Sequence, residues 1–566
     1  MRSARWLVGL AVVVLVAVQP AQAATTNGTW NVNAAGNWSL NTNWLGNTIA
    51  TDADGNAYFN AVDITANRTV TVDTLRTIGN LYFADTGTGT AFSWTLARSA
   101  ANTLTLDRTD ATAPIIDVGT MGTGAGVTIS CVLAGTDGFQ KTGVGQLTLS
   151  GTNTFTGTVY LKGGTLSSNI TTGHLGAQTN NIEISSGATW LVKERAVTPT
   201  RVIIAGTGGG AIEWGSGLSS GINLETDNQL QGSGDLTFTN GGANQQRVLV
   251  RGQNTLYNGK ITLAYNATSV PMSVSLASNE RPGGASATCL PNAKFEVNSG
   301  AGTTGYGLQL RFSGAVTQYE IAALSGNANG RVQPGTSTLD GTLYVNQSTN
   351  TTYAGEIGDS TTPRKLGLRK GGAGTLELTS AAGLTYTGAT AVDGGTLKVT
   401  GSIAASSGVT VASGATLKGG GTVPATTVST GGILAPGGSI GTLSGTNMIF
   451  SSGAVYTFEW LNSTGDVMAL SGNLTITNDA ATTVNASGSG TFPNATGLPL
   501  FTYGGTLLSG QANGTVLQWT VNGMPAPNAY VKVADAGGSI VLMPEPATLA
   551  LLGLGGLGLI LSRKRR

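Results

Sequence analysis

Short runs in which hydrophobic and polar residues alternate recur along most of this chain. Leu147 and Leu149 alternate with polar residues in one run, and Val159 and Leu161 do so in the next. An alternation with a period of two places one set of side chains on a buried sheet face and the other in solvent. Outside the two ends of the chain, no long segment has the 3.6-residue period of an amphipathic helix. The pattern therefore predicts an all-β protein made of short strands.

Two segments, 139–168 and 368–399, repeat each other. Both contain a lysine, spaced glycines, two alternating leucines and a Gly-Gly-Thr-Leu sequence. Lys141 of the first repeat corresponds to Lys370 of the second, and the Gly-Gly-Thr-Leu sequence at 163–166 corresponds to that at 394–397. The glycine pair suits a turn with positive φ between two strands. Such a unit cannot bury its hydrophobic face alone, whereas stacked units share one continuous core. The repeats therefore predict the coils of a β-solenoid.

The repeat resembles the autotransporter-associated β-strand repeat, which occurs in passenger regions built as right-handed parallel β-helices. The segments 25–44 and 431–445 also resemble the beginning and the end of such passengers. The resemblance implies a right-handed parallel β-helix. It does not extend to the end of the chain, because the stretch after 445 is too short for the large membrane barrel of an autotransporter.

The C-terminal tail combines three features: a Pro-Glu-Pro motif, an apolar segment and a basic end. They comprise Pro544, Glu545 and Pro546, then 547–561, then Arg563, Lys564, Arg565 and Arg566. Fifteen helical residues reach about 22 Å, less than the roughly 30 Å core of a bilayer. The positive-inside rule keeps the basic end in the cytoplasm. We therefore expect a short transmembrane helix that anchors the chain transiently.

This tail resembles the PEP-CTERM sorting signal of certain Gram-negative bacteria that produce exopolysaccharide. The resemblance implies that an exosortase-type membrane enzyme recognises the motif and processes the protein for release or surface attachment. An ordinary C-terminal membrane anchor is the alternative interpretation.

The N-terminal segment has the three parts of a secretory signal peptide. Arg2 and Arg5 precede the apolar stretch 6–18, and an Ala-x-Ala site ends at Ala23. We expect signal peptidase to cut before Ala24.

The patterns predict five regions along the chain. They are the signal peptide (1–23), an N-terminal β cap with the first coils (24–130), a β-solenoid (131–450), a C-terminal β region (451–540) and the sorting signal (541–566). The part 211–353 has strand-like runs without a clear repeat, so we expect degenerate coils with longer loops there. The region from 454 onward is expected to cap the solenoid and protect its open edge.

Composition narrows the functional classes. Only 10% of the residues are charged and the net charge is +1. The dense basic run is confined to the tail, which argues against nucleic-acid binding. Two cysteines, Cys131 and Cys289, are present. An extracytoplasmic location permits a disulfide between them. The alternative, which has the same weight, is that both are unpaired small residues buried in the core.

Candidate catalytic residues are sparse. His174 is the one histidine, and no nucleophile motif accompanies it, so we expect a loop residue. A glycosidase needs two carboxylates about 5–10 Å apart. The nearest acidic groupings, Asp52 with Asp54 and Asp107 with Asp110, have the sequence context of solvated turns. We therefore expect no catalytic residue, metal site or cofactor.

Three tryptophans, Trp30, Trp38 and Trp44, cluster near the beginning of the mature region. Exposed aromatic rings can stack on sugars, so these residues are candidate glycan contacts. Burial in the core of the N-terminal cap is the favoured alternative.

Together these features predict a secreted or cell-surface protein with a structural or adhesive role, associated with exopolysaccharide or a biofilm matrix. The alternative is an extracellular polysaccharide lyase or glycosidase on a β-helix scaffold.

Overall fold

The computed structural model describes residues 26–544 except for 88–89, 172, 195–198, 216–220, 242–245, 265–271, 278–288, 299–306, 313–315, 336–338, 360–363, 478–481, 490–496, 510–512 and 523–528. Ala23, Ala24 and the tail from Glu545 to Arg566 lie outside the described residues.

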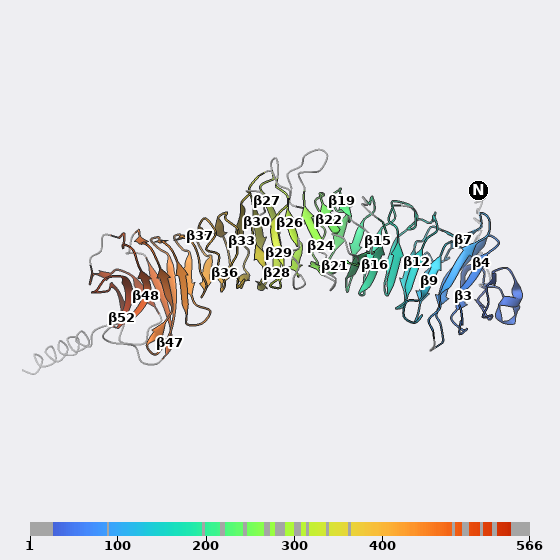
Figure 1. The fold of residues 1–566 in the computed structure, drawn as a ribbon, viewed down its shortest axis with the longest axis horizontal. Coiled ribbons are helices and arrows are strands. Elements are labelled where there is room, and N and C mark those ends of the chain that lie inside the picture. The colour runs from blue at the N-terminus through green and yellow to red at the C-terminus, as the bar shows by residue number, and fades with distance from the viewer. Residues whose placement is uncertain are drawn as a thin grey trace, which may run out of the picture.

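Short parallel strands stack side by side along the long axis of the molecule, which is an elongated rod (Figure 1). One sheet, here called the long sheet, follows nearly the whole rod. In order along the rod it comprises β2 (Gly36–Asn37), β4 (Arg68–Val72), β6 (Trp94–Arg98), β9 (Gly126–Ile129), β12 (Gln146–Leu149), β14 (Thr165–Ser168), β16 (Ala188–Val192), β18 (Gly210–Trp214), β21 (Leu236–Asn240), β23 (Lys260–Leu263), β25 (Lys294–Val297), β28 (Ala323–Gly326), β31 (Thr351–Tyr353), β34 (Thr375–Leu378), β36 (Thr396–Val399), β38 (Thr416–Gly419), β40 (Ile433–Pro436), β43 (Val455–Leu461), β47 (Thr483–Ser489) and β50 (Thr520–Asn522). The short β44 (Thr464–Gly465) pairs antiparallel with β43.

Further parallel sheets cover the other faces of the coils. The N-terminal half has β1 (Gly28–Thr29), β3 (Asp52–Phe59), β5 (Arg76–Phe83), β7 (Thr103–Leu106), β8 (Ile115–Val118), β10 (Val132–Ala134), β11 (Phe139–Thr142), β13 (Val159–Leu161), β15 (Ile182–Ile184), β17 (Ile203–Ala205) and β20 (Leu230–Gly232). The middle has β19 (Asn223–Leu224), β22 (Gln246–Val250), β24 (Met272–Leu276), β26 (Leu308–Leu310), β29 (Arg331–Pro334) and β32 (Glu356–Ile357).

A fourth sheet, here called the furrow sheet, covers one face of the C-terminal half. It comprises β27 (Gln318–Ile321), β30 (Gly341–Asn346), β33 (Leu366–Gly371), β35 (Thr390–Val392), β37 (Val409–Val411), β39 (Thr426–Val428), β42 (Met448–Phe450) and β46 (Leu474–Ile476), all paired in parallel.

At the C-terminal end the pairing changes from parallel to antiparallel. The cap sheet has the order β41 (Thr442–Gly445), β45 (Val467–Leu470), β48 (Leu498–Tyr503), β52 (Ser539–Pro544), β51 (Ala529–Val533) and β49 (Val516–Leu517). Its first three strands continue the solenoid, and its last three pair antiparallel. The pairing thus becomes antiparallel at this end of the rod, and the predicted boundaries of a separate C-terminal region, 451–540, stay a prediction.

The parallel stacking is the architecture of a β-solenoid, as the repeats predict. Leu147 of β12 lies in register with Leu166 of β14, which lies in register with Trp190 of β16. The long sheet also passes without interruption through the part of the chain that lacks a clear repeat, from β18 to β31. The right-handed sense of the coils stays a prediction.

A single hydrophobic core follows the axis of the rod from Trp30 to Leu542. The alternating residues Leu147, Leu149 and Val159 are all buried in it, as their spacing predicts. Each coil thus completes the burial of its neighbours, which a single coil cannot achieve for itself.

Helical structure among the described residues is restricted to two short 3₁₀ turns, η1 (Asn41–Asn43) and η2 (Leu45–Asn47). No helix in this part of the chain is long and apolar enough to cross a membrane. The expected transmembrane segment, 547–561, lies beyond the described residues.

Candidate functional site

The Pro-Glu-Pro motif begins inside the folded cap. Pro544 is the last residue of β52, a strand that pairs antiparallel with β48 on one side and β51 on the other. Its register partner in β51 is Ala529. The next two motif residues, Glu545 and Pro546, lie outside the described part of the chain. No linker therefore separates the folded cap from the beginning of the motif.

Each of the two sequence repeats holds a buried lysine in the same way. Lys141 and Lys370 point into the core from β11 and β33. The Nζ atom of Lys141 donates hydrogen bonds to the carbonyl oxygens of Thr142, Gly143 and Gly163 at 2.7, 3.0 and 3.1 Å. Lys370 donates to the corresponding carbonyls of its own repeat at 2.6, 3.2 and 3.1 Å, those of Gly371, Gly372 and Gly394. The ammonium group thus ties the turn of one coil to the Gly-Gly turn of the next.

Burial lowers the pKa of Lys141 to about 8, and it lowers the pKa of Lys370 to about 8 as well. The sequence shows the equivalence of the two lysines but not their role. An inward-facing lysine is rare in a core, and this one is accommodated because three carbonyls accept its protons.

The three clustered tryptophans form the core of the N-terminal cap, so the hypothesis that they contact glycans is wrong. Trp30, Trp38 and Trp44 are 0%, 0% and 2% exposed. Their ring centroids lie 5.2–5.9 Å from one another or from Phe59. Each indole N–H donates to a backbone carbonyl at 2.8–3.0 Å. The rings pack against one another and Phe59, and their N–H groups bond to the backbone, so the three tryptophans are core residues, which is the favoured alternative.

The remaining candidate residues have structural partners. Cys131 and Cys289 are both buried, and no disulfide joins them. His174 lies in a turn, where its Nδ1 accepts a hydrogen bond from the backbone N–H of Asn169 at 3.2 Å. Burial lowers the pKa of its imidazole. The expectation of a loop histidine is therefore confirmed.

The acidic groupings likewise stabilise connections between strands. Asp54 accepts hydrogen bonds from both the N–H and the hydroxyl of Thr109. Asp110 forms an ion pair with Arg108 at 2.7 Å, and the hydrogen bond from that guanidinium is the largest cause that lowers the pKa of Asp110. Among the described residues, no group of three or more His, Cys, Asp or Glu side chains is placed to hold a metal ion.

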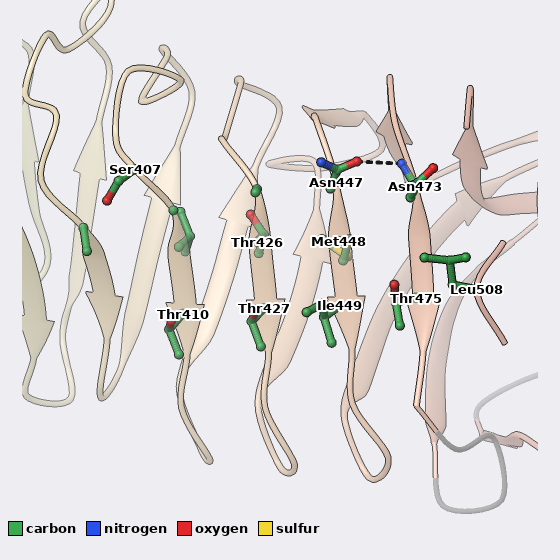
Figure 2. A pocket seen from close by; sticks show the side chains of 14 residues that line it. Ser407, Thr410, Thr426, Thr427, Asn447, Met448, Ile449, Asn473, Thr475 and Leu508 are labelled. Carbon is green, nitrogen blue, oxygen red and sulfur yellow. Dashed lines mark hydrogen bonds between the residues drawn. The ribbon is translucent and has the colours of Figure 1, made fainter. Parts of the chain in front are cut away.

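A surface furrow crosses the strands of the furrow sheet. One hollow of about 470 Å³ lies over β37, β39, β42 and β46. A second, of about 380 Å³, lies over β27, β30, β33 and the residues 387–389 that precede β35, and it shares Ala389 and Ser407 with the first. In Figure 2, Thr410, Thr427, Ile449 and Thr475 form one row across neighbouring strands. The two hollows adjoin at the residues they share, and the sequence pattern did not reveal either of them.

Comparisons with known proteins agree with both the repeats and the tail. Residues 139–167 and 368–399 match the model of the passenger-associated-transport-repeat. Residues 544–566 match the model of the PEP-CTERM protein-sorting motif. The chain is also 35% identical over 185 residues to the adhesin BmaC autotransporter of Brucella suis biovar 1 (strain 1330).

That similarity covers 31% of this chain and about 5% of the Brucella protein. The chain thus corresponds to a small part of its long relative. The resemblance expected from the sequence is confirmed: this is a β-solenoid protein that carries passenger-associated-transport repeats and a PEP-CTERM protein-sorting motif.

Proposed function

We propose that this chain is a secreted or cell-surface rod with a structural or adhesive role, delivered by a PEP-CTERM sorting route and processed by an exosortase-type enzyme. The observation that carries the proposal is the junction at Pro544, where the last strand of the cap sheet leads directly into the sorting motif. In this proposal the rod is exported with its tail as a transient inner-membrane anchor, then cut close to its folded end.

The repeats support the adhesive part of the proposal. They match a repeat associated with passenger transport, and the similar Brucella protein is described as an adhesin. A rod of stacked coils presents long, weakly charged faces at a distance from the cell, which suits contact with a matrix or another cell. We further propose a non-enzymatic role, with right-handed coils and with exopolysaccharide of the producing cells as partner.

Substitution of the motif tests this route. We expect Glu545→Ala, expressed in the producing cells, to remain in the membrane fraction and to lose surface labelling by roughly tenfold or more, because the processing enzyme no longer recognises the motif. Asp535→Ala is a matched control, since Asp535 is an acidic residue of the same cap that pairs with Lys532 at 2.8 Å. Equal surface labelling of the two variants would contradict the sorting route.

A further inference from the structure

The floor of the furrow is formed by residues that carry at most a methyl group. Ala389, Gly408 and Ala425 each precede a strand of the furrow sheet, and they follow one another from coil to coil. Backbone N–H groups connect them in register: Leu368 donates to the carbonyl of Ala389, Thr390 to that of Gly408 and Val409 to that of Ala425, at 2.9–3.0 Å. The larger hollow therefore lies where one row of positions carries at most a methyl group over successive coils.

The rim of the furrow offers hydrogen-bonding groups at a regular interval. Thr410 and Thr427 lie in register on β37 and β39, and neighbouring strands of a sheet are about 4.8 Å apart. Neither hydroxyl has a hydrogen-bond partner among the described residues, and the same holds for the hydroxyl of Ser407. At the far end, Asn447 accepts a hydrogen bond from the backbone of Asn473 at 2.7 Å (Figure 2), which orients its amide.

The charge of the lining favours an uncharged ligand. None of the fourteen residues around the larger hollow is ionisable. The smaller hollow has two ionisable lining residues of opposite charge, Lys365 and Asp340, so its lining carries no net charge. An anionic chain would therefore find no cation to receive it along the larger hollow.

The furrow also fits a glycan better than a peptide. It crosses the face of a sheet whose backbone groups already pair within the sheet, so it offers no free strand edge to an extended peptide. Hydroxyl groups both donate and accept, which matches the hydroxyls of a sugar chain. The exposed apolar side chains of Ile449 and Leu508, 42% and 51% exposed, provide contact for the apolar faces of sugar rings.

We propose that this furrow binds a strand of neutral polysaccharide that lies parallel to the axis of the rod. This inference rests on the proposed function, since it assigns a site and a ligand class to the adhesive role.

A furrow-filling substitution tests the site. Within 4 Å, an added Cβ at Gly408 meets one backbone oxygen, that of Ala425, at 3.4 Å, which is an ordinary contact. We therefore expect Gly408→Phe to fold and to place its ring in the furrow. Gly420→Phe is the matched control, because a Cβ there meets only the oxygen of Thr442 at 3.6 Å and the residue follows β38 of the long sheet, on another face. A double variant, Thr410→Val with Thr427→Val, removes both hydroxyls with little change of shape.

The probes are the neutral and acidic fractions of the exopolysaccharide from the producing cells, separated by anion exchange and immobilised. Protein purified from those cells should bind the neutral fraction. Gly408→Phe should weaken this binding by at least about tenfold, the double threonine variant by roughly fivefold, and Gly420→Phe should bind like the natural protein. Equal melting temperatures would show that all variants fold.

Three results would overturn the furrow proposal: no binding to the neutral fraction, a preference for the acidic fraction, or equal binding by Gly408→Phe and Gly420→Phe. Surface labelling of the same cells separates this failure from failure of the proposed function. A rod that reaches the surface but does not bind the neutral fraction contradicts only the furrow, whereas a rod that never reaches the surface contradicts the proposed function.

Discussion

At the residue scale, the buried lysines explain why the two repeats share more than an alternation of leucines. A charged group removed from water is costly unless it is fully hydrogen-bonded. Lys370 meets this condition by donating to three carbonyls, which belong to two successive coils. The same three bonds recur around Lys141. The lysine is therefore part of the contact between coils, although a sequence pattern alone suggests a surface residue.

We expect Lys370→Met to lower the free energy of unfolding by about 1–3 kcal/mol, because it removes the lysine donor from three turn carbonyls. The carbonyl of Gly371 keeps a second hydrogen bond, from the backbone N–H of Gln347. Lys398→Met is the control: Lys398 is partly exposed and pairs with Glu377 at 3.0 Å, so its loss should cost less than about 1 kcal/mol. Denaturant titration of both variants provides the measurement. A Lys370→Met protein as stable as the natural one would show that the three bonds do not stabilise the fold.

The pH dependence of this pair has a definite sign. Burial lowers the pKa of Lys370 to about 8 in the fold, and a lysine in the unfolded chain has a pKa near about 10.4. Between these values the unfolded state binds more protons, so stability rises with pH. The natural protein should therefore gain stability relative to Lys370→Met across this window, with a constant difference below about pH 8.

At the scale of the elements, the two glycines of each Gly-Gly turn differ in backbone conformation and in the space available for a side chain. Gly395 has a φ of +58°, and an added Cβ would lie 2.4 Å from the oxygen of Gly372 in the preceding coil. At Gly394 the nearest atom would be 3.4 Å away, and φ is not in the left-handed region. Gly164 of the first repeat has the same conformation as Gly395, with a φ of +60°.

The two positions give a matched pair of substitutions. Gly395→Ala should destabilise the protein by about 2–4 kcal/mol, since it combines a left-handed conformation with a clash against backbone. Gly394→Ala should change stability by less than about 1 kcal/mol. Thermal unfolding followed by circular dichroism would measure both, and an equal effect of the two would refute this account of the turn.

The sequence predicts individual coils better than it predicts surfaces. Leu147 and Leu149 are buried as their alternation indicates, because a period of two reports directly on the two faces of a strand. The furrow was not predictable in this way. It depends on Ala389, Gly408 and Ala425 being in register, and register is set by the lengths of the connections between strands rather than by the strands themselves.

The tryptophans show the corresponding limit for candidate sites. Trp30, Trp38 and Trp44 are close in the sequence, which indicates that they lie in one region of the fold. Whether their rings are exposed depends on residues distant in sequence. Phe59, from the next coil, packs against all three and leaves none of them for a ligand.

At the scale of the whole molecule, one core joins the N-terminal cap, the coils and the cap sheet. Each coil contacts its neighbours in sequence, so the stability of such a rod is a sum of local terms and the two ends need separate protection. The tryptophan cluster lies near the N-terminal end of the described rod, and the antiparallel strands β48, β52, β51 and β49 lie at its C-terminal end, where we expect them to protect the open edge. The last strand of the cap sheet, β52, also contains the first residue of the sorting motif.

The central claim is that the rod is delivered to the cell surface and cut where its fold ends. Mass spectrometry of the intact protein and of its C-terminal peptide, taken from fractionated producing cells, tests this claim most directly. We expect the protein in the surface or matrix fraction to end near Pro544. A chain that still ends at Arg566 and stays in the membrane fraction would contradict it.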